Sequence, residues 1–173
     1  MAIIDCRQIT AFLEALGKQY PHKTKLTLLG GGALCLLGSP RPTFDIDYAG
    51  SDLQKNDFQN LMDKIANEMG LEVEAVPIDE LTPLSYGEEK RAIRVGTFGN
   101  IEVIIIDPYV IALSKLDRGF DTDLEDIIFL MKRELISLPQ LEQTVEDAIP
   151  HARKFEMNPH ELEERLQTVR DEL

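Results

Sequence analysis

Hydrophobic residues recur at helical spacing in two stretches of the first half of the chain, residues 5–20 and 51–70. Each stretch opens with a polar residue followed three positions later by glutamine, the pattern of a capping box. The two boxes are Asp5 with Gln8, and Ser51 with Gln54. Gly70 stands where the second stretch ends, as expected of a helix C-terminus. We therefore predict two amphipathic helices over these stretches.

Between and after these helices, short apolar or alternating runs predict strands. They are residues 25–29, 44–50, 71–76, 91–96 and 101–107, the last two forming a hairpin around a turn at 97–100. A short helix is predicted at 33–38, and residues 77–91 are predicted to be irregular or partly helical. From Pro108 onward the pattern is helical, with helices predicted at 108–116, 122–134, 138–148 and 159–173.

This order of elements predicts an α/β fold. We expect a mixed β-sheet flanked by helices over residues 1–107, and a C-terminal helical region over 108–173 that packs on it as one compact unit. Asp107 is predicted to cap the helix that Pro108 begins, and Thr122 with Glu125 to form a capping box for the helix after it.

Composition narrows the classes of function. The 173 residues carry a formal net charge of −13, which argues against nonspecific binding of nucleic acid, because lysine and arginine supply most of that affinity. No apolar run reaches the length of a membrane span, and the N-terminus lacks the pattern of a secretory signal, so a cytoplasmic protein is expected. Cys6 and Cys35 have no metal-ligand spacing and are predicted to be buried free thiols.

The stretch GGGALCLLGSPRPTFDID, residues 30–47, carries the candidate chemistry. Side chains alternate along a strand, so Asp45 and Asp47 are expected on one side, with Phe44 and Ile46 directed into the core. Two carboxylates so close repel each other, and a divalent cation, Mg²⁺ with Mn²⁺ as the alternative, removes that repulsion. Glycine backbone approaches anions closely, so Gly30 and Gly31 are predicted to contact phosphate.

These residues resemble the signature of the nucleotidyltransferase superfamily that includes DNA polymerase beta and the minimal nucleotidyltransferases. The long form of the first block, with Arg41 and Thr43 ahead of the aspartates, resembles the bacterial branch that contains AbiEii-type toxins and uncharacterised relatives. A second block, YVIALSKLDRGFDTDLEDIIFLM, resembles the lysine, arginine and aspartate-rich helix start of that branch. Together with the helical tail, the two blocks cover most of the chain.

The resemblance implies roles for further residues. The family's third metal-binding carboxylate is matched by Glu102, with Asp107 as the competitor. Lys115 and Arg118 lie three residues apart on one helical face and are expected to bind the triphosphate. Arg41 either binds phosphate or pairs with Asp45. Thr43 either forms a hydrogen bond beside the aspartates or favours the strand, and Asp123 and Asp126 are expected to cap their helix and orient Lys115 or Arg118.

The activity that the resemblance implies is metal-dependent transfer of a nucleotidyl group from an NTP, such as ATP, to a hydroxyl, with release of pyrophosphate. The acceptor is a tRNA end, a protein side chain or a small molecule. Relatives in toxin–antitoxin systems suggest a cognate antitoxin as partner, with a homo-oligomer as the other expectation. The alternative is an inactive nucleotidyltransferase-like module that binds nucleotide or protein without turnover.

Overall fold

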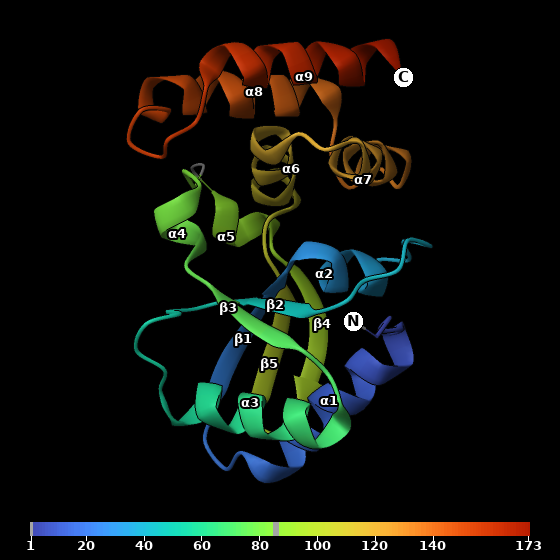
Figure 1. The fold of residues 1–173 in the computed structure, drawn as a ribbon, viewed down its shortest axis with the longest axis vertical. Coiled ribbons are helices and arrows are strands. Elements are labelled where there is room, and N and C mark those ends of the chain that lie inside the picture. Colours follow the sequence, from blue (N-terminus) through green and yellow to red (C-terminus); the bar gives the residue numbers. More distant parts are fainter. Residues whose placement is uncertain (1, 85–86) are drawn as a thin grey trace. The chain divides into compact units, whose positions relative to one another are not determined.

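The computed structural model describes residues 2–84 and 87–173, and their contacts divide into two compact units (Figure 1). The first unit comprises Met1–Ile78 and Ile93–Ile106, and the second comprises Asp79–Ala92 and Asp107–Leu173. The chain is a mixed α/β protein with helices flanking its sheet and a helical C-terminal part, as predicted. Residues 85–86 of the stretch predicted to be irregular or partly helical lie outside the described residues.

The first unit is built on a five-stranded mixed sheet with the strand order β3-β2-β1-β5-β4. The strands are β1 (Thr24–Leu29), β2 (Ile46–Ala49), β3 (Val73–Val76), β4 (Ile93–Phe98) and β5 (Ile101–Ile105). β1 lies between β2, which is antiparallel to it, and β5, which is parallel. β3 is parallel to β2 at one edge, and β4 pairs with β5 as the predicted hairpin at the other.

Helices α1 (Cys6–Gln19) and α3 (Asp57–Met69) supply apolar side chains to the core of this unit. They pack on each other, and Gln59 of α3 donates a hydrogen bond to the hydroxyl of Tyr48 on β2. Leu28, its partner Tyr48 and the β5 residues of that face are buried, whereas Lys25 and Glu102, on the opposite face, are exposed. The sheet therefore has an apolar face and a more polar face.

The start of α3 and the exposure of Phe44 differ from the sequence prediction. The helix expected from Ser51 begins at Asp57, because Asn56 and Gln59 form another capping box; Ser51 instead caps a turn by accepting from the Gln54 amide. Phe44 was expected in the core but is 43 % exposed, because β2 begins only at Ile46.

Helix α2 (Gly30–Leu36) also differs from the prediction, which began the helix at residue 33. The glycines themselves form its first turn, directly after β1. Both cysteines are free thiols, as predicted, but only Cys35 is buried and Cys6 is half-buried. The Cys6 thiol donates to the Cys35 carbonyl oxygen at 2.9 Å.

The second unit is helical, and α6 (Pro108–Arg118) contacts α7 (Asp121–Lys132), α8 (Leu138–Ala148) and α9 (Pro159–Asp171). The short helices α4 (Ile78–Leu81) and α5 (Glu88–Arg91) precede β4, and a 3₁₀ turn at Ile149–His151 follows α8. α7 begins at Asp121, so Thr122 lies inside the helix, and the predicted capping box of Thr122 with Glu125 is wrong. Asp123 instead accepts the backbone amide of Phe120 at the start of the helix. Within the described ranges, no helix combines the length and apolar composition needed to cross a bilayer.

Candidate functional site

The turn between β1 and α2 packs directly against the second aspartate of the Asp-Ile-Asp sequence. Gly30 has a φ of +68°, a conformation that residues with a Cβ atom rarely adopt. A Cβ atom at this position would lie 2.4 Å from Oδ2 of Asp47, and one at Gly31 would lie 2.7 Å from Oγ1 of Thr43. The glycines are therefore required for the close approach of the turn to the segment that carries the aspartates.

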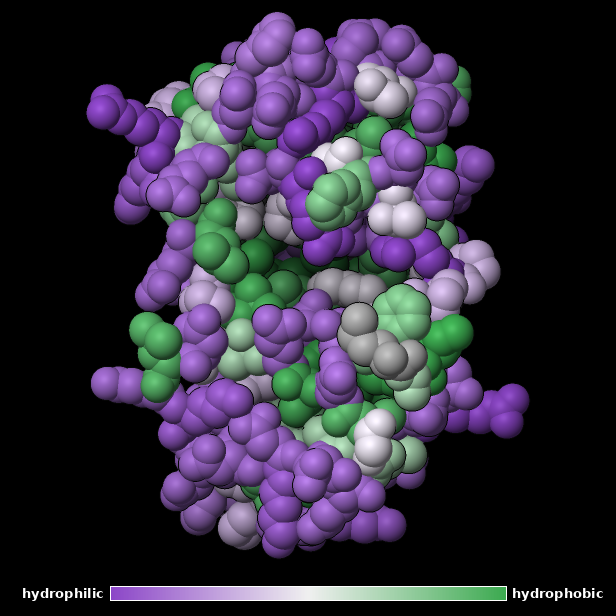
Figure 2. All heavy atoms as spheres, viewed as in Figure 1, coloured by the Kyte–Doolittle hydropathy of each residue, from purple (hydrophilic) through white to green (hydrophobic). Residues whose placement is uncertain are grey.

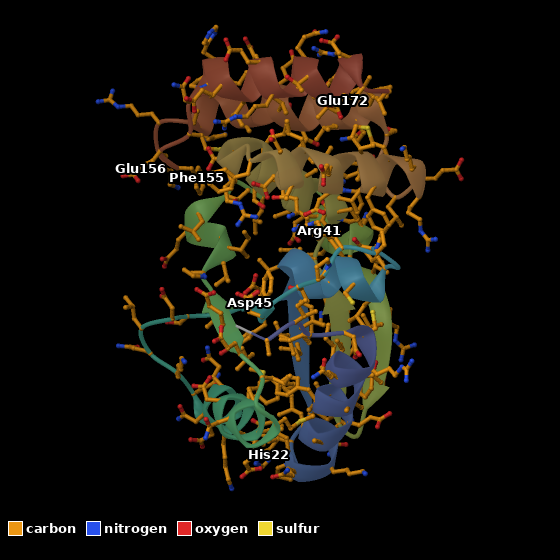
Figure 3. All side chains as sticks on the ribbon, turned by 45° about the vertical axis from the view of Figure 1, so that its right-hand side comes forward. His22, Arg41, Asp45, Phe155, Glu156 and Glu172 are labelled. Atoms are coloured by element: carbon orange, nitrogen blue, oxygen red, sulfur yellow. The ribbon has the colours of Figure 1, made fainter. Side chains whose placement is uncertain are left out.

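Thr43 fixes the segment that leads into β2. Its side chain is buried, and its hydroxyl donates to the backbone oxygen of Asp45 at 3.1 Å. Its carbonyl accepts from the backbone amide of Ile4 at 2.8 Å. Of the two roles predicted for Thr43, the structure has the hydrogen bond beside the aspartates. Asp45 follows as the residue at the entry to β2 (Figure 3).

Glu74 on β3 joins the two aspartates. It faces Asp47 in the parallel register of β2 and β3, and carboxylate oxygens of Asp45, Asp47 and Glu74 all lie within 4.8 Å of one another. Two aspartates are half-buried and the glutamate is exposed. Like charges directly opposite each other on neighbouring strands are destabilising, so three carboxylates here favour a bound cation.

The donor set fits a hard divalent cation. Mg²⁺ takes oxygen ligands, is held by few protein carboxylates and completes its coordination with water and substrate phosphates. Glu74 is exposed, so water and phosphate have room to reach the three carboxylates from its side. On the side of Asp47, the adjoining glycine turn has no Cβ atom that would collide with this carboxylate. Asp45, Asp47 and Glu74 are thus the residues that would hold the ion.

Glu102, the residue matched to the third carboxylate, lies elsewhere on the same sheet face. It pairs with Lys25 on β1, whereas Asp47 pairs with Leu29, four residues further along that strand. At about 3.3 Å per residue the two positions are roughly 13 Å apart along the strand direction alone, and β5 and β2 lie on opposite sides of β1. Among the described residues, Glu102 is not part of the carboxylate cluster.

Asp107, the competitor for that position, is fully buried in the second unit. Its Oδ1 accepts from the backbone amide of Tyr109 at 2.9 Å, which is the predicted capping of α6. Its Oδ2 accepts from the guanidinium of Arg91 at 2.7 Å. These contacts give Asp107 a structural role in the second unit.

The predicted phosphate ligands Lys115 and Arg118 belong to a charge network of the second unit, in which Lys115 and both aspartates are buried and Arg118 is exposed. The Lys115 ammonium is 5 % exposed and lies 2.7 Å from Asp126 and 3.5 Å from Asp123. Arg118 binds Asp123 through Nε at 2.9 Å and through Nη2. Asp123 and Asp126 therefore orient both cations, and a contact of either cation with a triphosphate stays a prediction.

The electrostatics of Asp123 reflect this network. Burial acts to raise the pKa of its carboxyl group, but the hydrogen bonds from Arg118 and the charge of Lys115 outweigh burial and lower the pKa below its ordinary value. Asp123 is therefore held as a carboxylate, and its negative charge keeps Arg118 and Lys115 in place. Arg41 is half-buried between α2 and β2, and neither of its two predicted roles is decided (Figure 3).

The order of the predicted elements, rather than the residue types, is the feature of the sequence that could have identified Glu74. β2, α3 and β3 form a strand–helix–strand unit, and such a crossover usually places the second strand parallel to the first in the same sheet. Because β3 lies beside β2, Glu72 and Glu74 lie on the same face of the sheet as Asp45 and Asp47. The pairing of strands, rather than a motif, identifies the third carboxylate.

Comparison with known proteins identifies a family that the chain matches over most of its length. The family model described as "Nucleotidyltransferase of unknown function (DUF6036)" matches residues 6–170, which include the glycine turn, the carboxylate cluster and the charge network. No curated protein and no solved structure matches the chain.

Proposed function

Because this chain belongs to the nucleotidyltransferase family of the DUF6036 model, we propose that it transfers a nucleotidyl group from an NTP to a hydroxyl acceptor with the help of a divalent cation at Asp45, Asp47 and Glu74. The observation that carries the proposal is the convergence of these three carboxylates beside the glycine turn. Family membership supports the transfer chemistry, and the carboxylate geometry supports the dependence on metal.

The reaction is an in-line displacement at phosphorus. The acceptor oxygen forms a bond to the α-phosphorus, the bond from that phosphorus to its bridging oxygen breaks, and pyrophosphate leaves with the electron pair. The acceptor proton is lost to solvent. Asp45, Asp47 and Glu74 would hold the divalent cation, which would supply the positive charge that polarises the α-phosphate and lowers the pKa of the attacking hydroxyl.

The protein's own residues supply position and charge. Asp45, Asp47 and Glu74 concentrate negative charge at one point of the sheet, and Thr43 holds Asp45 through its backbone. A side chain at Gly30 would collide with Asp47, one of the proposed metal ligands. We retain Gly30 and Gly31 as proposed phosphate contacts, and Lys115, Arg118 and Arg41 as further proposed phosphate ligands on the strength of the family resemblance alone.

The test follows transfer of label. The full chain is incubated with each α-³²P-labelled NTP, Mg²⁺ or Mn²⁺, and separate pools of tRNA, protein and small hydroxyl compounds. We expect label to be transferred to an acceptor in one of the pools. The labelling is lost when EDTA is added, and it is also lost in the variants Asp45→Asn and Asp47→Asn. Asp52→Asn, which changes an exposed aspartate outside the cluster, serves as the matched control and retains activity.

Two other outcomes contradict the proposal. Magnesium-dependent NTP binding without transfer to any pool identifies an inactive nucleotide-binding module. Transfer that persists in the Asp47→Asn variant would show that the carboxylate cluster takes no part in the reaction.

The resemblance to AbiEii-type toxins supports a role in a toxin–antitoxin system, with a cognate antitoxin as partner. Induced expression in a bacterial host is then expected to arrest growth, whereas Asp45→Asn produced at the same level does not. Equal growth of the two strains contradicts this role and leaves the transferase chemistry untouched.

A further inference from the structure

The carboxylate cluster opens onto a cavity of the first unit. The cavity has a volume of about 400 Å³ and lies between the second half of α3 and the edge strand β3. Asp45 and Glu74 line it together with Glu72, Asp63 and Asn67. This volume lies within the range of pockets that hold small molecules. A molecule in the cavity would therefore touch two of the three proposed metal ligands.

The lining of this cavity is acidic. Among the described residues it has four carboxylates, one side-chain amide and no lysine or arginine. Lys55 reaches Asp63 from outside the lining, at 2.8 Å, but both side chains are more than a third exposed. An exposed pair of this kind contributes little stability and exchanges readily with a competing cation.

Binding of the metal ion and NTP at the neighbouring site does not make the acidic cavity positive. The one divalent cation proposed here offsets only about half of the charge of an NTP, so the site that faces the cavity keeps a net negative charge. RNA, whose binding depends on neutralising its phosphates with lysine and arginine, is disfavoured here. An acceptor that carries ammonium groups gains charge-assisted hydrogen bonds at the same place.

We propose that this cavity binds the acceptor of the nucleotidyl group, and that the acceptor is a small hydroxyl compound bearing ammonium groups. The inference rests on the proposed function. Glu72 and Asp63 bind the ammonium groups, Asn67 hydrogen-bonds a neighbouring hydroxyl, and the reacting hydroxyl lies at Asp45 and Glu74, where its oxygen attacks the α-phosphorus as described above.

The probe is an aminocyclitol with two amino groups and several hydroxyls, compared with its N-acetylated form, which keeps the ring hydroxyls but not the positive charges. Binding is followed by the backbone ¹H–¹⁵N shifts of Asn67 and Glu72 in the full chain with Mg²⁺. We expect saturable shifts with the amine and none with the N-acetylated form. Glu72→Gln and Asp63→Asn each weaken binding at least fivefold, whereas Glu68→Gln, an exposed α3 glutamate outside the lining, does not.

Transfer is then measured with the same probes. We expect label on the aminocyclitol, with a raised KM in Glu72→Gln but an unchanged affinity for Mg²⁺–NTP. Equal binding of the two probes, or transfer to RNA or neutral compounds without aminocyclitol binding, overturns this inference and leaves the transferase intact. Glu72-dependent binding of the amine without transfer from any NTP has the opposite meaning: the cation-binding cavity stands, and both the acceptor assignment and the transferase fail.

Discussion

The backbone of Gly30 and the carboxylate of Asp47 approach so closely that a Cβ atom at Gly30 would lie 2.4 Å from Oδ2 of Asp47. The two residues come from different elements, the first turn of α2 and the strand β2. Their contact couples the turn that is proposed to face phosphate to a carboxylate that is proposed to hold metal. A change in one is therefore expected to displace the other.

Gly30→Ala is expected to abolish Mg²⁺-dependent NTP binding, because the added methyl group displaces Asp47. Gly70→Ala is the matched control: Gly70 also has a φ of +68°, but nothing lies within 4 Å of its added Cβ atom. Both variants lose about 1–3 kcal/mol of unfolding free energy through backbone strain, measured by urea denaturation. Isothermal titration with Mg²⁺–NTP then separates them, and equal affinities in the two variants would show that the contact with Asp47 is irrelevant to the site.

Glu74→Gln is expected to weaken Mg²⁺ binding about tenfold or more, because the variant removes one of three converging charges. Glu102→Gln removes a charge from the same sheet face, offset by roughly 13 Å along the strand direction and by two strands across the sheet, and is expected to leave the affinity unchanged. Displacement of bound Mn²⁺ by Mg²⁺, followed by electron paramagnetic resonance, measures the Mg²⁺ affinity of both variants. The reverse ranking would restore Glu102 as the third ligand.

Lys115→Met is expected to reduce the free energy of unfolding by about 3–5 kcal/mol, because it leaves Asp126 buried without the ammonium group 2.7 Å away. Lys55→Met breaks an exposed pair with Asp63 at nearly the same distance, 2.8 Å, and is expected to cost about 1 kcal/mol or less. Urea denaturation of both variants checks the contrast. A loss below 1 kcal/mol in both would mean that the Lys115 network does not stabilise the second unit.

Stability is expected to depend on pH through Asp123, whose pKa is lowered in the folded chain. A carboxyl group with a lowered folded pKa contributes stability above its unfolded pKa of about 3.9, and this contribution is lost as the pH falls through the folded pKa. Arg118→Gln removes a hydrogen-bonded cation that lowers this pKa. The difference in unfolding free energy between wild type and variant should therefore be constant from pH 7 to about 5 and shrink below about 4. A difference that grows on acidification contradicts the assignment.

Local chemistry predicted much of the helical framework. The Asp5–Gln8 capping box and the Asp107–Pro108 start form as expected, because a cap needs only residues within one turn. The start of α3 was placed wrongly because Ser51–Gln54 and Asn56–Gln59 have the same spacing. The exposure of Phe44 depends on where β2 begins pairing, which is a long-range property.

The difference between local and long-range interactions also explains which residues of the candidate site could be predicted from the sequence. Asp45 and Asp47 could be proposed from strand alternation alone, since both lie in one short segment. Choosing between Glu74 and Glu102 requires knowing which strands neighbour β2 and in which register, and residue types do not determine this. Both glutamates lie in apolar strands of similar appearance, and only the sheet order separates them.

The discontinuous second unit has a consequence for dissecting the protein. A fragment of residues 1–106 contains the whole sheet but also keeps α5, whose Arg91 would lose its ion pair with Asp107 and whose packing partner α6 would be missing. The complementary fragment from residue 107 onward would lack those same contacts. Removing the tail by proteolysis therefore damages both products, and separating the two units cleanly requires a short loop that replaces residues 79–92.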